Sequence, residues 1–285
     1  MKPAPFSYCR PGSLTDAVAA LADDPDAKVL AGGQSLVPLL SMRLAAPSML
    51  VDINGVPDLD HVRVDDSGVR VGALARHADV LASPDVRRTQ PLVSLALSHV
   101  AHATIRNRGT TVGSIVHADA AAEMPMVLTL LDGSVTVASA GGTRTIPASG
   151  LYAGPLESTL HHDEIALEAF FPALAPGEGV AFAEIARRHG DYALVGVGGV
   201  VRIEGDQVLS ARAGYLSVCD VPTAVDVTQA WGDDEAVVEL ALSRLDPADD
   251  IHATAAYRAQ LVRVLTRRVL RAAYDDARHR AEGAA

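Results

Sequence analysis

The stretch Val29-Leu30-Ala31-Gly32-Gly33-Gln34-Ser35-Leu36 decides how the rest of the chain is interpreted. Its first two residues predict a short buried strand, and residues 36–42 predict a helical turn. The paired glycines between them let the backbone bend tightly, so consecutive N–H groups can converge on an anion. The stretch therefore predicts a cradle for a pyrophosphate, with an ordinary glycine turn as the alternative.

This segment matches neither common nucleotide fingerprint. No G-x-G-x-x-G follows a strand here, and the sequence holds no G-x-x-x-x-G-K-[ST]. A dinucleotide bound here would not be held as in a Rossmann fold or a P-loop.

A second segment with similar chemistry is Ile105-Arg106-Asn107-Arg108-Gly109-Thr110-Thr111-Val112-Gly113-Ser114. Its arginines and hydroxyls suit phosphate oxygens, and a later carboxylate, Asp119 or Glu123, could accept hydrogen bonds from a ribose. Its content of Gly, Thr and β-branched residues predicts a loop leading to a strand over residues 107–116. A solvated basic loop is the alternative. The two segments together favour a dinucleotide cofactor.

The flanking sequence mixes strands and helices. Ser13 can cap a helix, with Asp16 placed to complete a capping box. Residues 172–179 are the most linker-like segment, and we place the main domain boundary there. The other expected elements are strands at 49–53, hairpins at 61–72 and 195–218, and helices at 84–100, 120–131 and from 251 onward.

Composition limits the function classes. Of the 285 residues, 49% are hydrophobic, and the formal charge of -11 opposes binding to nucleic acid. Cys9 and Cys219 lie too far apart to hold an iron–sulfur cluster or a Cys-rich zinc site. The N-terminus lacks the apolar segment of a signal peptide, and no apolar run is long enough for a transmembrane segment. We therefore expect a cytoplasmic protein.

The remaining candidates predict structural roles. His99 with His102, and His161-His162-Asp163, lack a third ligand at metal spacing, so no metal site is expected. Residues 196–199, Gly-Val-Gly-Gly, predict tight packing within a strand. Arg263, Arg267 and Arg271 predict a solvated helix face, with contact to an acidic partner as the alternative. No set of residues predicts a catalytic acid, base or nucleophile.

The glycine segments lie in a longer series of motifs that resembles a known family. The series comprises residues 31–40, Leu50-Val51-Asp52-Ile53-Asn54, residues 105–110, Ser114-Ile115-Val116-His117-Ala118-Asp119, Glu123 and Arg187-Arg188-His189-Gly190-Asp191-Tyr192-Ala193. It resembles the FAD-binding medium subunit of molybdenum hydroxylases, the xanthine and carbon monoxide dehydrogenase family. The resemblance covers nearly the whole chain.

The resemblance implies an α+β fold in two domains. Residues 1–175 would form a two-subdomain FAD-binding domain of the vanillyl-alcohol-oxidase (PCMH) type, with subdomains at about 1–55 and 56–175. Residues 176–285 would form a smaller domain like the carbon monoxide dehydrogenase flavoprotein C-terminal domain, an antiparallel sheet with helices.

The resemblance also implies which residues bind non-covalent FAD. Two segments would hold its pyrophosphate, and they comprise Leu30, Ala31, Gly32, Gly33, Gln34, Ser35 and Leu36, and Thr110, Thr111, Val112, Gly113 and Ser114. Glu123 would lie on the adenosine side, and Ile165 and Ala166 would flank the adenine. Ala101 and His102 would lie on the loop that approaches the flavin, and Tyr192 near the isoalloxazine ring.

One position departs from the family pattern. Val112 stands where the family commonly has the first of two glycines, and a branched side chain restricts the backbone. We expect weaker FAD binding or a rearranged loop. A lysine often found after the domain boundary is also missing, with Ala183 and Glu184 in that neighbourhood.

The implied function is electron transfer within a multi-subunit molybdenum hydroxylase. The chain would pass electrons from a small [2Fe-2S] subunit through FAD to an external acceptor, and a large subunit would carry molybdopterin, in a dimer of heterotrimers. One alternative, raised by Val112, is a structural subunit that has lost the cofactor. The other is a stand-alone flavin oxidoreductase.

Overall fold

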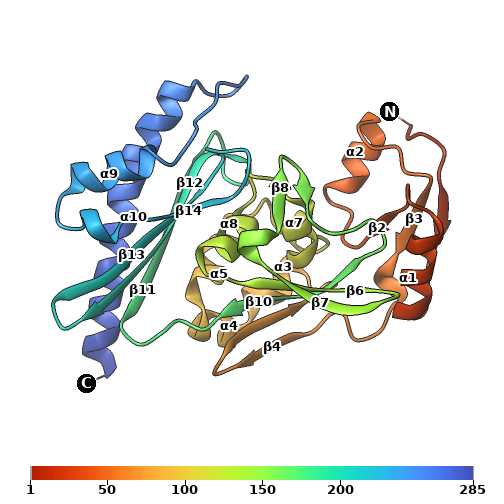
Figure 1. Cartoon of the computed structure of the whole chain (residues 1–285), viewed down its shortest axis with the longest axis horizontal. Helices are drawn as coiled ribbons and strands as arrows, with labels where there is room; N and C mark the ends of the chain where they lie inside the picture. Colours follow the sequence, from red (N-terminus) through yellow and green to blue (C-terminus); the bar gives the residue numbers. More distant parts are fainter. Residues whose placement is uncertain (1, 285) are drawn as a thin grey trace.

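The computed structural model describes residues 2–284 and arranges them as three units along the long axis of the molecule (Figure 1). Each unit has its own sheet. The predicted α+β class is confirmed, including the antiparallel sheet with helices at the C-terminal end. None of the helices in residues 2–284 is both long and apolar enough to cross a bilayer.

The N-terminal unit is a parallel sheet with strand order β1-β3-β2. The cap on its first helix forms as predicted, because Ser13 Oγ accepts the N–H of Asp16 at 3.1 Å. The Asp16 carboxylate binds the Ser13 hydroxyl instead of the Ser13 N–H, so only one half of the predicted capping box is present. The elements of this unit are β1 (Ser7–Cys9), α1 (Leu14–Asp23), β2 (Lys28–Leu30), α2 (Leu36–Met42), β3 (Met49–Asp52) and the 3-10 turn η1 (Ile53–Gly55).

The second unit is an antiparallel sheet with order β4-β5-β10-β6-β7, and helices pack on it. Its strands are β4 (Val62–Asp65), β5 (Gly68–Gly72), β6 (Ser134–Ser139), β7 (Gly142–Pro147) and β10 (Ile165–Pro172). Its helices are α3 (His77–Ala82), α4 (Pro84–Thr89), α5 (Pro91–Leu97), α6 (Ala103–Arg106), α7 (Thr111–His117) and α8 (Glu123–Leu130). The turn η2 (Ala148–Gly150) and a small sheet of β8 (Tyr152–Gly154) and β9 (Glu157–Ser158) complete it.

The C-terminal unit is an antiparallel sheet with order β11-β12-β13-β14. Its elements are β11 (Glu178–Ala186), β12 (Ala193–Glu204), β13 (Gln207–Leu216), β14 (Thr223–Asp226), η3 (Thr228–Ala230), α9 (Asp234–Leu242) and α10 (Ala255–Ala284). The long α10 covers one face of this sheet, and α8 of the second unit packs on the other. The second and third units are therefore joined through a shared helical layer.

Glycines on β12 and β13 bring these layers close together, as the sequence predicted for residues 196–199. A Cβ on Gly198 would lie 3.0 Å from Leu130 Cδ2, and a Cβ on Gly199 would lie 2.8 Å from Val269 Cγ1. Of the three arginines predicted on a solvated face of α10, Arg271 is exposed, whereas Arg263 and Arg267 pair with glutamates of α9.

Two expectations about secondary structure are wrong. Residues 84–100 form two helices, since the backbone leaves helical geometry at Gln90, directly before Pro91. Residues 107–116 do not lead into a strand but into helix α7. Thr110 caps this helix with its side chain, and Thr111, Val112 and Ile115 are buried on one side of it. Packing of that apolar side outweighs the strand propensity of the β-branched residues.

Candidate functional site

The first glycine segment forms the predicted turn between β2 and α2. Gly33 has φ +73°, a conformation that favours glycine. The N–H groups of Gly33, Gln34 and Ser35 have no hydrogen-bond partner among residues 2–284. Ser35 precedes the first residue of α2, and its side chain makes no capping bond. The turn therefore presents a row of free donors to a ligand.

The second glycine segment is held rigidly. Thr110 Oγ1 accepts the N–H of Gly113 at 3.2 Å, and the Thr111 hydroxyl lies 3.1 Å from Nδ1 of the buried His77. Burial lowers the pKa of His77 to about 4, so this imidazole is neutral at pH 7. The backbone N–H of His77 also donates to the carbonyl of Gly109 at 3.0 Å.

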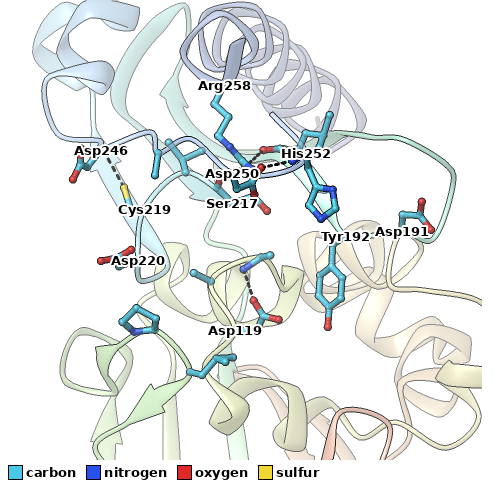
Figure 2. A pocket seen from close by; sticks show the side chains of 18 of the residues that line it. Asp119, Asp191, Tyr192, Ser217, Cys219, Asp220, Asp246, Asp250, His252 and Arg258 are labelled. Atoms are coloured by element: carbon cyan, nitrogen blue, oxygen red, sulfur yellow. Dashed lines mark hydrogen bonds and ion pairs between the residues drawn. The ribbon is translucent and has the colours of Figure 1, made fainter. Parts of the chain in front are cut away.

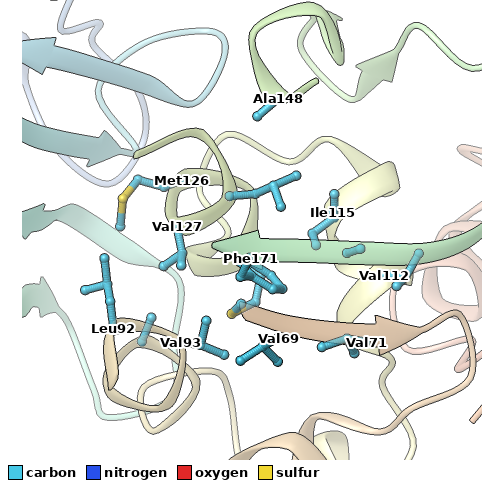
Figure 3. Close-up of a cluster of buried hydrophobic side chains, with 14 of the residues drawn as sticks. Val69, Val71, Leu92, Val93, Val112, Ile115, Met126, Val127, Ala148 and Phe171 are labelled. Atoms are coloured by element: carbon cyan, nitrogen blue, oxygen red, sulfur yellow. The ribbon is translucent and has the colours of Figure 1, made fainter. Parts of the chain in front are cut away.

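Val112 does not obstruct the cradle. Its side chain is 1% exposed and belongs to the core cluster with Ile115, Phe171 and Val71 (Figure 3). Its φ is not among the positive values, so the backbone needs no glycine at this position. The structure therefore gives no support to the expected rearrangement of the loop around this valine.

The two glycine segments lie against each other. A Cβ on Gly32 would collide with the carbonyl oxygen of Arg108, and it would lie 2.9 Å from Gly109 Cα and 3.0 Å from Thr110 N. Because all three atoms belong to the backbone, only a glycine permits this approach. Residues 78 positions apart in sequence, Gly32 and Thr110, thus form one site.

The two arginines of the second segment differ in their surroundings. Arg106 Nη1 donates to the carbonyls of Val100 at 2.8 Å and Ala101 at 2.9 Å, so it braces the loop that carries Ala101 and His102. Arg108 has an exposed side chain.

The loop at Ala101 and His102 meets the loop that precedes Tyr192. A Cβ on Gly190 would lie 2.6 Å from His102 Cε1 and 3.0 Å from Ala101 O. Gly190 has φ +85° and Ala101 has φ 43°, so both backbones adopt the left-handed conformation at this contact. The structure therefore brings together two predicted parts of the flavin site, Ala101 with His102 and the Gly190–Tyr192 turn.

Tyr192 lines a cavity of about 740 Å³ between the second and C-terminal units (Figure 2). Arg258 builds part of its wall, donating to the carbonyls of Leu194 and Ser217, both at 2.7 Å, and to Asp250 Oδ2 at 2.5 Å. Further carboxylates on the wall are Asp119, Asp191, Asp220 and Asp246. Within residues 2–284 no group of three or more His, Cys, Asp or Glu side chains is arranged to hold a metal ion.

Glu123 is the first residue of α8, and its carboxyl group is buried. Burial, with a smaller contribution from the Glu184 carboxylate, raises the pKa of Glu123 to about 8. Glu184 Oε1 lies 3.3 Å from His99 Nδ1, and its Oε2 has no partner among the described residues. The hydrogen bond with Glu184 raises the pKa of His99. Glu123 therefore belongs to a titratable cluster at the junction of two units.

We expect Glu123 to make stability depend on pH. Its carboxyl ionises near pH 4.5 when unfolded but near pH 8 when folded, so the free energy of unfolding falls as pH rises through that window. Thermal melts of the apoprotein from pH 5 to pH 8 should show a smaller decline for Glu123→Gln than for the wild type. Glu157→Gln removes an exposed glutamate and serves as the control. An unchanged slope in Glu123→Gln would contradict the assignment.

Ile165 and Ala166 lie at the start of the central strand β10, and both are buried. Ile165 packs in the core cluster of the N-terminal unit, whereas Ala166 packs in that of the second unit. They mark the junction of these units, and each shares a core cluster with a residue of a glycine segment, Ile165 with Ala31 and Ala166 with Val112.

Three residues that support the site were not predicted from the sequence: Arg76, His77 and Asn54. Asn54 was quoted in a family motif but was given no role in the site. Arg76 bonds to Asn54, which is 22 positions away, and to Arg108, which is 32 positions away. No local pattern marks such contacts. The only available signal was the position of Asn54 directly after a predicted strand.

The two glycine segments fit the diphosphate of a dinucleotide. Free N–H groups line the first, the backbones approach as closely as glycine allows, and the Val112 side chain points into the core. Such a group of unpartnered donors is suited to phosphate oxygens. The residues present therefore fit FAD, the cofactor that the resemblance implies.

Comparison with known proteins gives the same assignment. Residues 4–174 match the family model for the FAD binding domain in molybdopterin dehydrogenase, and residues 180–273 match the carbon monoxide dehydrogenase flavoprotein C-terminal domain. The 6-hydroxypseudooxynicotine dehydrogenase complex subunit alpha of Paenarthrobacter nicotinovorans is 42% identical, over 98% of this chain and 97% of that one. The nicotine 6-hydroxylase medium subunit of the same organism is 39% identical, over 95% and 98%.

A solved structure is similar over nearly its full length. The carbon monoxide dehydrogenase of Hydrogenophaga pseudoflava, in a form that lacks the Mo-pyranopterin moiety, matches with a TM-score of 0.92 and 32% identity, covering 97% of this chain and 99% of that one. The chain thus belongs to the family of FAD-binding medium subunits of molybdenum hydroxylases and is a subunit of an oxidoreductase.

Proposed function

We propose that this chain carries non-covalent FAD and passes electrons from a small [2Fe-2S] subunit to an external acceptor. The close approach of the two glycine segments, the first of which has N–H groups without a partner, is the observation that carries this proposal. When bound, FAD supplies both one-electron and two-electron chemistry. The protein contributes the position of the cofactor and the electrostatic environment around it.

The partners follow from what the described residues lack. Cys9 lies in β1 and Cys219 lies on the wall of the large cavity, so these cysteines form no cluster site together. The [2Fe-2S] cluster and molybdopterin would belong to a small and a large partner subunit, in a dimer of heterotrimers. The large subunit would bind and select the substrate of the complex.

The predicted residue roles and domain limits belong to the same proposal. Residues 1–175, with subdomains at about 1–55 and 56–175, would hold FAD, and residues 176–285 would form the C-terminal domain. The glycine segments would bind the diphosphate, Glu123 would face the adenosine side and Ile165 with Ala166 the adenine. Tyr192 would lie near the isoalloxazine ring, with the adjacent cavity as the route of the acceptor.

Purification with the partner subunits tests this function. We expect a complex of three different chains with FAD equimolar to this one, and heat denaturation should release the flavin into solution because it is not covalently bound. Apoprotein made by removing FAD should regain flavin absorbance when FAD is added. A colourless complex that cannot be reconstituted would support a cofactor-free structural subunit. A monomer with full turnover would support a stand-alone oxidoreductase.

A further inference from the structure

A chain of hydrogen bonds joins the two glycine segments through two side chains. Asn54 Nδ2 donates to the carbonyl of Ala31 at 2.9 Å, and Asn54 Oδ1 accepts from Arg76 Nη2 at 2.7 Å. Arg76 Nη1 then donates to the carbonyl of Arg108 at 2.8 Å. Ala31 belongs to the first segment, and Arg108 directly precedes Gly109 of the second. We call this chain of bonds the Asn54–Arg76 bridge.

The Asn54 end of the bridge is fixed by the N-terminal unit. Asp52 Oδ1 accepts the backbone N–H of Asn54 at 2.9 Å and the side-chain Nδ2 at 2.6 Å. The other carboxylate oxygen of Asp52 accepts the hydroxyl of Tyr8 at 2.5 Å. These bonds fix the orientation of the Asn54 amide, so its oxygen faces Arg76.

The Arg76 end is fixed by the second unit. Arg76 forms an antiparallel backbone bridge with Thr110, and its N–H lies 3.4 Å from Asp79 Oδ2. The next residue is the buried His77, which bonds to Gly109 and Thr111. The backbone that carries the Arg76 side chain is therefore itself hydrogen-bonded to the second glycine segment.

The bridge is important because no strand pairing joins the two glycine segments. The first segment follows β2 of the parallel sheet, whereas the second lies among the helices of the other unit, and the two sheets share no strand. A planar guanidinium that donates to both sides can fix their separation, since its donors have a rigid geometry. A ligand that spans both segments binds more tightly when their spacing is already set.

We propose that Asn54 and Arg76 are positioning residues for the cofactor, which set the spacing of the two glycine segments for its diphosphate. The inference rests on the proposed binding of FAD. It assigns no direct contact between these side chains and the cofactor. Its prediction is that breaking the bridge weakens FAD binding in a protein that is still folded.

The test measures the affinity of apoprotein for FAD by flavin fluorescence. Arg76→Gln cannot donate to both sides of the bridge, and we expect its dissociation constant to rise about tenfold to a hundredfold, the range for bonds that involve a charged group. Arg76→Lys keeps the charge but offers a single donor atom, so we expect an intermediate value. Asn54→Ala breaks the link to Ala31 and should weaken binding similarly. The double variant Asn54→Ala/Arg76→Gln should lose little more than either single variant.

Arg212→Gln is the matched control. Arg212 also makes two bonds across elements, to Asp132 at 2.5 Å and 3.1 Å, but it lies away from the glycine segments. Melting temperatures of every apoprotein, without FAD, report loss of structure separately. We expect Arg212→Gln to leave FAD affinity unchanged, whatever its effect on melting.

The outcomes separate this inference from the proposed function. If the wild type binds FAD and folded Arg76→Gln and Asn54→Ala bind it equally well, the positioning role is wrong and the function stands. If the wild type binds no FAD, the function itself fails. Should Arg76→Gln not fold, Arg76→Lys and Asn54→Ala decide the matter, because normal affinity in both would overturn the inference.

Discussion

Gly32→Ala should weaken FAD binding strongly while the chain remains folded. A Cβ at this position would collide with the carbonyl oxygen of Arg108 and lie within 3.0 Å of Gly109 Cα and Thr110 N. These are backbone atoms, so no side chain can rotate away to make room. The two segments would have to separate, and the spacing that a diphosphate between them requires would be lost. We expect FAD affinity to fall by more than about a hundredfold, or roughly 2.7 kcal/mol.

The measurement is FAD titration of apoprotein, with thermal melts alongside. Gly12→Ala is the matched control, because a Cβ at Gly12 would meet nothing within 4 Å and its φ is not positive. Gly33→Ala is informative too. Its Cβ meets no backbone atom, but alanine is strained at φ +73°. We therefore expect the free energy of unfolding to fall by about 1–2 kcal/mol. Near-normal FAD binding by Gly32→Ala would show that the two segments do not hold the cofactor together.

The first glycine segment could be predicted because its signal is local. A short apolar strand, paired glycines and an apolar helix start stand next to one another in residues 29–42, and the structure has β2, the Gly33 turn and α2 there. The same holds for the hairpins, where alternation and turn residues lie within one short window. Local sequence alone determines such elements, so contacts with distant residues do not change which element forms.

The second segment was misread because its outcome depends on distant residues. Thr110, Thr111 and Val112 are β-branched and favour a strand by propensity. They form a cap and a first helical turn because Val112 packs in the core, and the buried Thr111 places its hydroxyl 3.1 Å from His77 Nδ1. His77 and the core residues Val71 and Phe171 all lie far from this segment in sequence. The Asn54–Arg76 bridge was missed for the same reason.

Val112→Gly should destabilise the protein without raising the amount of flavin bound per folded chain. The valine was expected to disturb the cradle, yet its side chain is buried with Ile115 and Phe171 (Figure 3). Removing it loses about 1.5–3 kcal/mol of side-chain burial. Glycine within α7 adds about 0.4 kcal/mol relative to valine, because of the freedom that glycine gains when the chain is unfolded. We expect a total loss of about 3 kcal/mol in the free energy of unfolding.

Val112→Ala separates these two contributions, because it removes the two methyl groups but keeps a good helix former. Its loss should therefore be smaller than that of Val112→Gly by about 1 kcal/mol. Denaturant unfolding of the apoprotein gives both values, and FAD titration below the melting transition gives affinity per folded chain. If Val112→Gly instead raised flavin content from near zero, the valine would be what keeps FAD out, and the cofactor-free structural subunit would replace the flavoprotein as the function. A stable Val112→Gly protein would show that the side chain does not pack in the core.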